Sequence, residues 1–279
     1  MSVLITGASG FVGSHLIKKI NNKNIILISS KKRAGFIKLD IHKKKFDILN
    51  KYNIDTCIHL AWSDIPNYSK KNSYTNYLTS KELFKYLLNR GCKKIISLGS
   101  CWEYSENYGK KNEKNDKKSE NIFGYYKKKL AYYGLKQCRK KNAIFTWLRV
   151  FYVYGDKKKG LLKYLVNCEK FKEKIILKNP YKINDFIFIQ DIVQCILLCV
   201  KKNYHGIFNL GSGNKITTMT FCKNFLKIKK NKKKIYLKYN NTINKNGIWA
   251  CMKKTEKVIG FFPRFKLKNG IKKSLKYIN

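Results

Sequence analysis

The hydrophobic residues of this chain gather into short, almost continuous runs that are separated by longer polar stretches. Runs rich in Val, Ile and Leu are typical of parallel strands that are buried on both faces. They occupy residues 3–5, 24–30, 36–41, 57–62, 94–98, 143–150 and 206–213. Between some of them, residues 76–90 and 161–171 place leucines at helical spacing. This alternation predicts an α/β fold built on a doubly wound parallel sheet.

Three glycines follow the first predicted strand at regular spacing. Gly7, Gly10 and Gly13 form the pattern Thr-Gly-x-x-Gly-x-x-Gly, which leads into a helical segment at residues 15–20. A tight turn from strand to helix needs glycine for its backbone angles, and a side chain there would keep a pyrophosphate away from the backbone. The start of the following helix offers free N–H groups to such an anion. The pattern therefore predicts a dinucleotide-binding turn.

The end of the second predicted strand bears on which dinucleotide binds. In dinucleotide-binding folds an acidic residue at this point binds the adenosine ribose, whereas a basic residue accommodates a 2′-phosphate. Here Ser30, Lys31, Lys32 and Arg33 follow the strand, and no Asp or Glu does. Lysine occurs throughout the chain, but arginine is rare, which makes Arg33 more informative than its neighbours. The sequence favours NADP(H) and leaves NAD(H) open.

The net charge of +45 raises the question of nucleic-acid binding. Bidentate recognition of phosphates and bases favours arginine. Only five of the 61 basic residues are arginines, and the lysines are spread along the whole chain. The composition therefore argues against a specific nucleic-acid partner and indicates a lysine-covered, solvated surface. Non-specific binding to polyanions at low salt is still expected.

Other classes of protein are disfavoured by what the chain does not contain. No apolar run approaches the length of a membrane span, and the N-terminus enters a predicted strand at once, so we expect neither a membrane segment nor a signal peptide. The nine cysteines show no paired zinc-ligand spacing. These features predict a reduced, cytoplasmic protein without a metal site.

The segment Thr6-Gly7-Ala8-Ser9-Gly10-Phe11-Val12-Gly13 resembles the nucleotide-binding turn of extended short-chain dehydrogenases/reductases, the NAD-dependent epimerase/dehydratase family. Further similar segments follow in the family's order as far as Ile271. The resemblance implies a Rossmann domain over residues 1–160 and 184–212. It implies a smaller, mostly helical substrate lobe over residues 161–183 and 213–279. It also implies a nucleotide-diphosphate sugar as substrate and is compatible with a homodimer.

The resemblance also implies which residues contact the two ligands. For the cofactor these are the turn, the ends of the second to fourth strands, a supporting Asn and the catalytic pair: Gly7, Ser9, Gly10, Phe11, Val12, Gly13, Ser30, Arg33, Asp40, Ile41, Leu60, Ala61, Trp62, Asn76, Tyr125 and Lys129. For the substrate they are Ser100, Trp102, Tyr152 and Arg264. His59 is interpreted as a buried strand residue, and Arg149 as either an ion-pair partner or a ligand.

A catalytic set is expected from Ser100, Tyr125 and Lys129. Tyr125 and Lys129 are four residues apart, so they are neighbours on one helix face, where an ammonium lowers the pKa of a phenol. Three other Tyr/Lys pairs have the same spacing: Tyr77/Lys81, Tyr132/Lys136 and Tyr154/Lys158. The pair at 125 and 129 is preferred because Lys129-Leu130-Ala131 continues as the family does, and because Ser100 ends a strand about two dozen residues earlier.

The residues after Ser100 narrow the expected reaction. Dehydratases of the family carry an Asp-Glu pair after the catalytic hydroxyl, whereas this chain has Cys101-Trp102, with Glu103 one position late. We therefore expect an NAD(P)-dependent reductase of a 4-keto (deoxy) sugar nucleotide from a surface-polysaccharide pathway. A nucleotide-sugar epimerase that retains NAD is the alternative. A non-catalytic dinucleotide-binding or polyanion-binding protein is a third possibility, disfavoured because such proteins tend to lose the catalytic Tyr or Lys.

Overall fold

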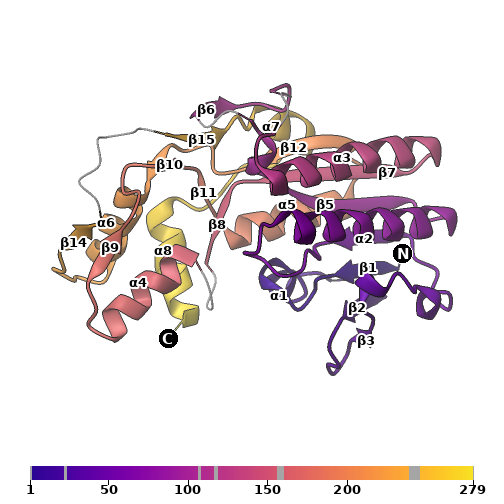
Figure 1. Ribbon diagram of the computed structural model, residues 1–279, viewed down its shortest axis with the longest axis horizontal. Coiled ribbons are helices and arrows are strands. Elements are labelled where there is room, and N and C mark those ends of the chain that lie inside the picture. Colours follow the sequence, from indigo (N-terminus) through magenta and orange to yellow (C-terminus); the bar gives the residue numbers. More distant parts are fainter. Residues whose placement is uncertain are drawn as a thin grey trace.

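The computed structural model describes residues 2–21, 24–105, 108–115, 119–155, 160–238 and 246–278. Within them, the largest sheet has seven strands, all parallel, in the order β12-β7-β5-β4-β1-β2-β3 (Figure 1). Their bounds are β1 Val3–Thr6, β2 Ile25–Ser29, β3 Ile37–Lys38, β4 Thr56–His59, β5 Lys94–Ser100, β7 Ile144–Val150 and β12 Gly206–Leu210. The parallel sheet that the hydrophobic runs predict is confirmed.

The direction in which the chain winds changes between β1 and β4. From β1 the sheet grows through β2 to β3 on one side, and through β4, β5 and β7 to β12 on the other. In open α/β sheets the crevice beyond the carboxyl ends of the strands at such a point is where ligands bind. Here those ends are Gly7, which follows β1, and Leu60, which follows β4.

Helices cover both faces of the sheet. Helix α1 (Phe11–Leu16) packs with α5 (Ile189–Lys201) on one face, and α2 (Lys70–Asn89) packs with α3 (Ile122–Lys140) on the other. The strand side chains alternate between these two layers, since Ile5 belongs to the core on the α5 side and Leu4 to the core on the α2 side. Burial on both faces explains why the strands are continuously apolar rather than alternating.

Several predicted elements differ from those observed, and the helix predicted at residues 15–20 begins earlier, at Phe11 of α1. The strand expected over residues 36–41 shrinks to β3, because the Asp40 carboxylate accepts a hydrogen bond from His42 N–H and begins the 3₁₀ turn η1 (Ile41–Lys43). Helix α2 begins at Lys70, where Ser69 caps it, and not at Asn76. Strand β6 (Tyr108–Lys111) is not among the predicted strands.

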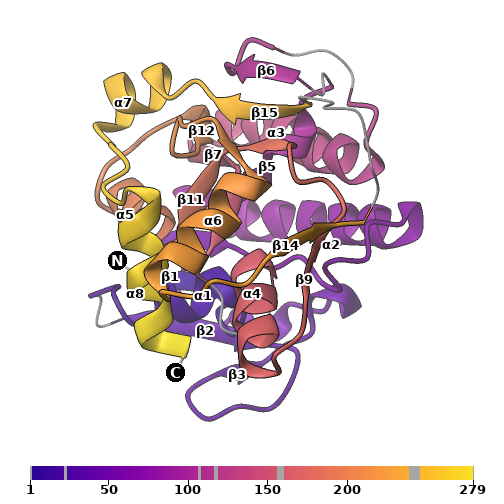
Figure 2. The ribbon, with the colours of Figure 1, turned by 90° about the vertical axis from the view of Figure 1, so that its left-hand side faces the viewer.

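The rest of the chain forms a smaller body at the left of Figure 1, which faces the viewer in Figure 2. Its longest elements are helices, as the resemblance implies, and very short strands join them. Its helices are α4 Gly160–Lys170, α6 Thr218–Ile228 and α8 Leu267–Ile278, whereas α7 Lys253–Ile259 packs against β12 and α5. The strands are β8 Tyr152–Tyr154, β9 Ile175–Leu177, β10 Ile183–Asn184, β11 Phe186–Phe188, β13 Ile216–Thr217, β14 Ile235–Leu237 and β15 Gly247–Ala250.

These strands pair in small sheets that join distant parts of the chain. Parallel pairs link β8 with β11 and β9 with β14, and a four-stranded sheet has the order β13-β10-β15-β6. Strand β6 therefore pairs with β15, near the opposite end of the sequence. Among the described helices, none combines the length and the apolarity needed to cross a membrane.

Candidate active site

The glycine turn packs closely against the end of β4. Gly7 has a φ of +66°, and a Cβ atom there would lie 2.7 Å from the Ala61 nitrogen. A Cβ on Gly13 would lie 2.3 Å from the Gly7 carbonyl oxygen. Ser9 and Gly10 are exposed, while Phe11 and Val12 pack in part against the core. The turn needs glycine at both ends because backbone, not side chain, surrounds it.

A buried histidine joins the turn to helix α2. His59 Nδ1 lies 2.8 Å from Thr6 Oγ1, and His59 Nε2 lies 2.9 Å from Ser80 Oγ. The side chain is 2% exposed, and burial, assisted by the charge of Lys127, lowers the pKa of His59 to about 3. His59 is therefore a neutral structural residue, as expected, and Thr6 Oγ1 also accepts from Ala61 N–H.

The loop after β4 is held by a side chain of α2. The Asn76 Oδ1 atom accepts a 2.7 Å hydrogen bond from Ser63 N–H, and its Nδ2 group donates to Asn72. Asn76 therefore supports the loop that carries Trp62, and Leu60 and Ala61 are only partly buried beside the turn. The indole Nε1 atom of Trp62 is buried and has no hydrogen-bond partner among the described residues.

The predicted residues for the adenosine end lie beyond β2 and β3. Ser30 and Arg33 are exposed after β2 ends at Ser29, and the charged segment at residues 31–33 continues with no acidic side chain. Asp40 and Ile41 lie at the end of β3, where Leu39 N–H donates to Ser29 O and so brings the two strand ends together. The structure thus places these residues along the same edge of the sheet as the glycine turn.

Ser100 caps a 3₁₀ turn at the carboxyl end of β5. In η3 (Cys101–Glu103), Trp102 N–H donates to Ser100 Oγ, and Ser100 N–H donates to Glu103 Oε1 at 2.8 Å. This is a capping box, which holds the turn from both sides. The Ser100 hydroxyl accepts within the turn, so its own proton can be donated to a bound ligand.

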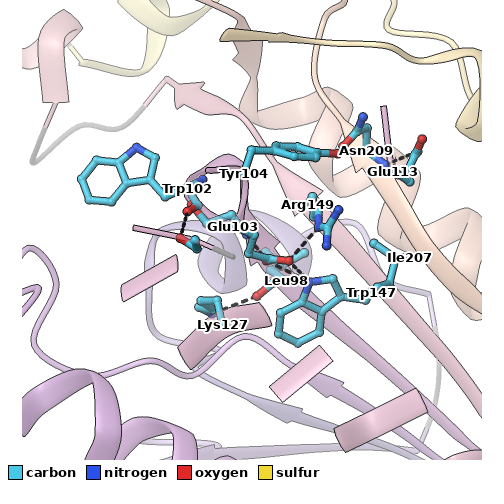
Figure 3. A network of polar contacts seen from close by, with 12 residues as sticks. Leu98, Trp102, Glu103, Tyr104, Glu113, Lys127, Trp147, Arg149, Ile207 and Asn209 are labelled. Atoms are coloured by element: carbon cyan, nitrogen blue, oxygen red, sulfur yellow. Dashed lines mark hydrogen bonds and ion pairs between the residues drawn. The ribbon is translucent and has the colours of Figure 1, made fainter. Parts of the chain in front are cut away.

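Glu103 points into the protein and not toward a ligand (Figure 3). Its carboxylate forms a buried ion pair with Arg149 Nε at 2.7 Å and accepts from Trp147 Nε1 at 2.9 Å. The Arg149 guanidinium lies 4.8 Å from the Tyr104 ring centroid. Of the two roles considered for Arg149, the structure shows the ion pair, and the Asp-Glu arrangement of a dehydratase is absent at Cys101 and Trp102.

Helix α3 turns Phe123 and Lys127 toward the end of β5. Phe123 is 6% exposed and Lys127 is 8% exposed. The Lys127 ammonium donates to Leu98 O at 2.9 Å (Figure 3). It also lies 3.9 Å from the centroid of the Trp62 ring. Burial lowers the pKa of Lys127 to about 7, although the charge of Glu103 opposes this change.

The expected pair Tyr125 and Lys129 lies on another face of α3. Residues two apart differ by about 160° around a helix, so Tyr125 and Phe123 point in nearly opposite directions. The Lys129 ammonium is 5.8 Å from the Tyr125 ring and 5.4 Å from the ring of Tyr77, which belongs to α2. The two residues are neighbours, as expected, but they face α2. The geometry corrects their assignment to a common site with Ser100.

Aromatic side chains from two segments, the loop between β4 and α2 and the turn η3, surround Phe123. Its ring centroid lies 5.5 Å from Trp62, 5.0 Å from Tyr68 and 5.8 Å from Trp102. Tyr68 and Trp102 are themselves 4.7 Å apart. Trp102 Nε1 donates to the Tyr152 hydroxyl at 3.4 Å, so the structure brings the predicted substrate residues Trp102 and Tyr152 together.

Arg264 is not brought to this aromatic group by any contact between described residues. It is exposed in the segment before α8, where its backbone N–H donates to the Asp191 carboxylate at 3.0 Å. Its predicted contact with the substrate phosphates stays a prediction.

The residues at this edge of the sheet fit a dinucleotide. The turn at Gly7 to Gly13 leaves no room for side chains within it, which keeps the backbone accessible to a phosphate. Trp62 Nε1 is a buried donor that needs an acceptor. Lys127, beside it, is the one lysine that α3 buries in the described chain. Sequence reasoning missed Lys127 because only Tyr/Lys pairs were considered, although Phe123 and Lys127 have the same four-residue spacing.

Comparison with known proteins gives consistent results. The NAD dependent epimerase/dehydratase family matches residues 3–211. The chain is 30% identical to a dTDP-4-dehydro-6-deoxyglucose reductase of Escherichia coli, covering 99% of this chain and 97% of that protein. It is 26% identical to a dTDP-6-deoxy-L-talose 4-dehydrogenase (NAD(+)) of Aggregatibacter actinomycetemcomitans, covering 86% and 94%. A UDP-glucose 4-epimerase from Thermotoga maritima, solved with UDP-glucose, has the same fold, with a TM-score of 0.88 at 21% identity over 99% and 98% of the two chains.

Proposed function

Because the chain belongs to the NAD-dependent epimerase/dehydratase family, we propose that it reduces the 4-keto group of a deoxysugar nucleotide with NADPH or NADH. The observation that carries the proposal is the buried Lys127 ammonium, which donates to Leu98 O two residues before Ser100, at the edge of the sheet where the glycine turn lies. Similarity over nearly the whole length of the E. coli reductase supports the choice of substrate class.

Different residues of this site would bind the cofactor and the substrate. The turn from Gly7 to Gly13 would hold the cofactor diphosphate, and Lys127 and Trp62 would hold its nicotinamide end. The bound cofactor would supply the hydride. Ser100 would donate a hydrogen bond to the keto oxygen, which polarises the carbonyl and stabilises the charge that develops on it. Trp102 and Tyr152, joined by a hydrogen bond, would form a wall for the sugar.

The same residues bear on two other reactions of the family, dehydration and epimerisation. A 4,6-dehydratase is disfavoured because Cys101 is buried and Glu103 is bound to Arg149. An epimerase would need a group that accepts and returns a proton in every cycle, and Phe123 has no such group. A non-catalytic dinucleotide-binding protein is disfavoured because the chain belongs to an enzyme family and is similar to a reductase over nearly its whole length. The division into two lobes at residues 160, 184 and 212 also remains a proposal.

The test follows the absorbance of the reduced nicotinamide with purified protein and a panel of 4-keto-6-deoxy sugar nucleotides. Consumption of cofactor equal to the alcohol formed would support the reductase. Protein that carries tightly bound NAD and interconverts sugar epimers without net consumption would instead support the epimerase. No turnover and no binding of either dinucleotide would contradict the proposal.

The choice between NADPH and NADH is tested at Arg33. We propose that this exposed guanidinium, with Ser30, binds the 2′-phosphate, because no acid stands at the end of β2. Arg33→Ser should raise the KM for NADPH by about tenfold, the typical worth of one charge-assisted hydrogen bond, and should leave the KM for NADH nearly unchanged. Arg139→Ser, an exposed arginine at the end of α3, is the matched control. An equal effect of Arg33→Ser on both cofactors would contradict the preference.

A further inference from the structure

The helix face that carries Lys127 has no hydroxyl four residues earlier. The ring at that position is Phe123, whereas Tyr125 packs against the core on the α2 side, where Lys129 lies between its ring and that of Tyr77. Reduction of a ketone nevertheless needs a proton for the alkoxide oxygen as the hydride arrives. If the proposed reaction is correct, this proton comes from another residue.

The phenol of Tyr68 lies beside Phe123, whose own ring has no hydroxyl. It lies in the loop between β4 and α2, directly before Ser69, which caps α2. Its ring contacts the rings of both Phe123 and Trp102, with centroids 5.0 Å and 4.7 Å away. The Tyr68 ring thus lies between Phe123, four residues before Lys127, and the turn that follows Ser100.

The Tyr68 hydroxyl is available to a ligand. It is half-buried, and it has no hydrogen-bond partner among the described residues. Burial raises the pKa of Tyr68, so the phenol is protonated at neutral pH. A protonated phenol suits the donor of a reduction, which has to give up a proton rather than accept one.

We propose that Tyr68 is the catalytic acid of this protein, a role that has moved from helix α3 to the loop after β4. The inference rests on the proposed reductase function. In the reaction, the keto carbon gains a hydride from the reduced cofactor, the π electron pair of the C=O bond moves to oxygen, and Tyr68 gives its hydroxyl proton to that oxygen. The sugar is reduced, the cofactor is oxidised, and solvent returns a proton to the half-exposed phenolate.

Tyr152 is the competing phenol. Its hydroxyl also lies in this region, but it is bound to Trp102 Nε1, and its ring lies against Phe186 of β11 and not against Phe123. Burial raises the pKa of Tyr152 to about 12, which keeps it protonated as well. The contact with Phe123 is what favours Tyr68, and substitution of each tyrosine separates the two.

The experiment measures kcat with a 4-keto-6-deoxy sugar nucleotide and NADPH or NADH for the wild type, Tyr68→Phe, Tyr152→Phe, Phe123→Tyr and the double variant Phe123→Tyr/Tyr68→Phe. Each change removes or adds one oxygen, so the packing is preserved, and thermal unfolding checks the fold. Tyr74→Phe is the matched control, because this phenol on α2 is 46% exposed and its ring lies against Tyr126 rather than against Phe123 or Trp102.

Tyr68→Phe should lower kcat by about 10²–10⁴-fold, the usual contribution of a general acid. The double variant should regain at least tenfold, because it places a phenol beside Lys127 again. Tyr74→Phe should keep wild-type activity. Rescue by a hydroxyl at another residue is a result that a merely structural role of Tyr68 would not produce.

The other outcomes overturn the inference in distinguishable ways. Full activity of Tyr68→Phe, or the larger loss in Tyr152→Phe, would show that Tyr68 is not the donor while leaving the reductase intact. An inert wild type together with an active Phe123→Tyr would show that the acid has been lost and not moved. If the wild type and Phe123→Tyr are both inert with every substrate and both cofactors, the proposed function fails as well.

Discussion

The Lys127 ammonium occupies a costly position inside the protein. It has one carbonyl oxygen, Leu98 O, and the face of the Trp62 ring as its nearest favourable contacts. The charged form loses hydration there, and the carboxylate of Glu103, which attracts it, is already paired with Arg149. Natural proteins keep such a group where its charge serves a ligand, since structure alone gains little from it.

This burial gives a prediction for stability against pH. The pKa of Lys127 is about 7 in the folded protein, against an ordinary value of 10.5. Between these values the unfolded chain binds a proton that the folded protein does not, so stability should rise as pH rises from 7 to 10.5, by about 1.4 kcal/mol per pH unit at most. Below pH 7 the charged lysine lowers stability by a constant amount.

The measurement is urea unfolding of the wild type and Lys127→Met at pH 7 and pH 9.5. The variant should be the more stable of the two at pH 7, and this difference should shrink at pH 9.5. The pH dependence of the many exposed lysines is common to both proteins and cancels in the comparison. Equal pH dependence of the two proteins would show that Lys127 is not buried as described.

The sequence predicted correctly where the glycine turn and Ser100 lie in the fold, but not which face of α3 carries Tyr125 and Lys129. The glycine turn and Ser100 were predictable because their positions are fixed by local chain geometry at strand ends. The pair at 125 and 129 was chosen by its residue types. The face of α3 is set instead by packing: Gly124 lies against Trp102 O, and Phe123 lies against Trp62. Such contacts across the fold are not visible in the spacing of Tyr and Lys.

At the scale of elements, the position of the site depends on how closely α3 approaches η3. A Cβ atom on Gly124 would lie 1.8 Å from Trp102 O and 2.7 Å from Ser119 Oγ. The Ser119 hydroxyl donates to the same carbonyl oxygen at 2.9 Å. The start of α3 is therefore pressed against the turn that carries Ser100, and only glycine permits this approach.

Gly124→Ala should consequently destabilise the protein. Overpacking costs typically about 1–3 kcal/mol, and the gain in helix propensity of about 1 kcal/mol offsets part of it. Turnover should fall as well, because α3 moves Phe123 and Lys127 away from Ser100. Lys136→Ala, at an exposed position of the same helix, supplies the control in chemical unfolding. A Gly124→Ala protein more stable than the wild type would contradict the contact.

The elements themselves were predictable to different degrees. The strands of the large sheet were found because long apolar runs require burial on both faces. Strand β3 was overestimated because Asp40 ends it with a side-chain hydrogen bond. Strands of two to four residues, such as β10 and β6, were missed, since so few residues show no periodicity and their pairing depends on partners far along the chain.

For the whole molecule, the charge of +45 is the dominant property. Exposed lysines lie on α2, α3, α6 and α8 alike, so the positive charge is spread over many elements. Long-range repulsion among them opposes folding, and attraction to any polyanion is strong at low salt. We therefore expect electrostatic binding without sequence preference.

This expectation is tested with two double-stranded DNA fragments of equal length and different sequence. Affinity for both should fall by the same factor as salt rises from 50 to 200 mM, with the logarithm of the affinity linear in the logarithm of salt concentration. Heparin should compete with both fragments equally. A preference of more than about tenfold for one sequence that survives at 200 mM salt would reveal a specific nucleic-acid site.

The pairing of β6 with β15 has a consequence for synthesis on the ribosome. Residue 108 emerges 139 residues before residue 247, which at ~5–20 residues per second is a delay of roughly 7–28 s. During this time β6 lacks its partner strand. Asn209, which donates to Lys111 O, also lacks its second acceptor, Cys251 O. Lys110 and Lys111 place positive charge on this unpaired edge. We expect that charge to discourage pairing between nascent chains on the same messenger RNA.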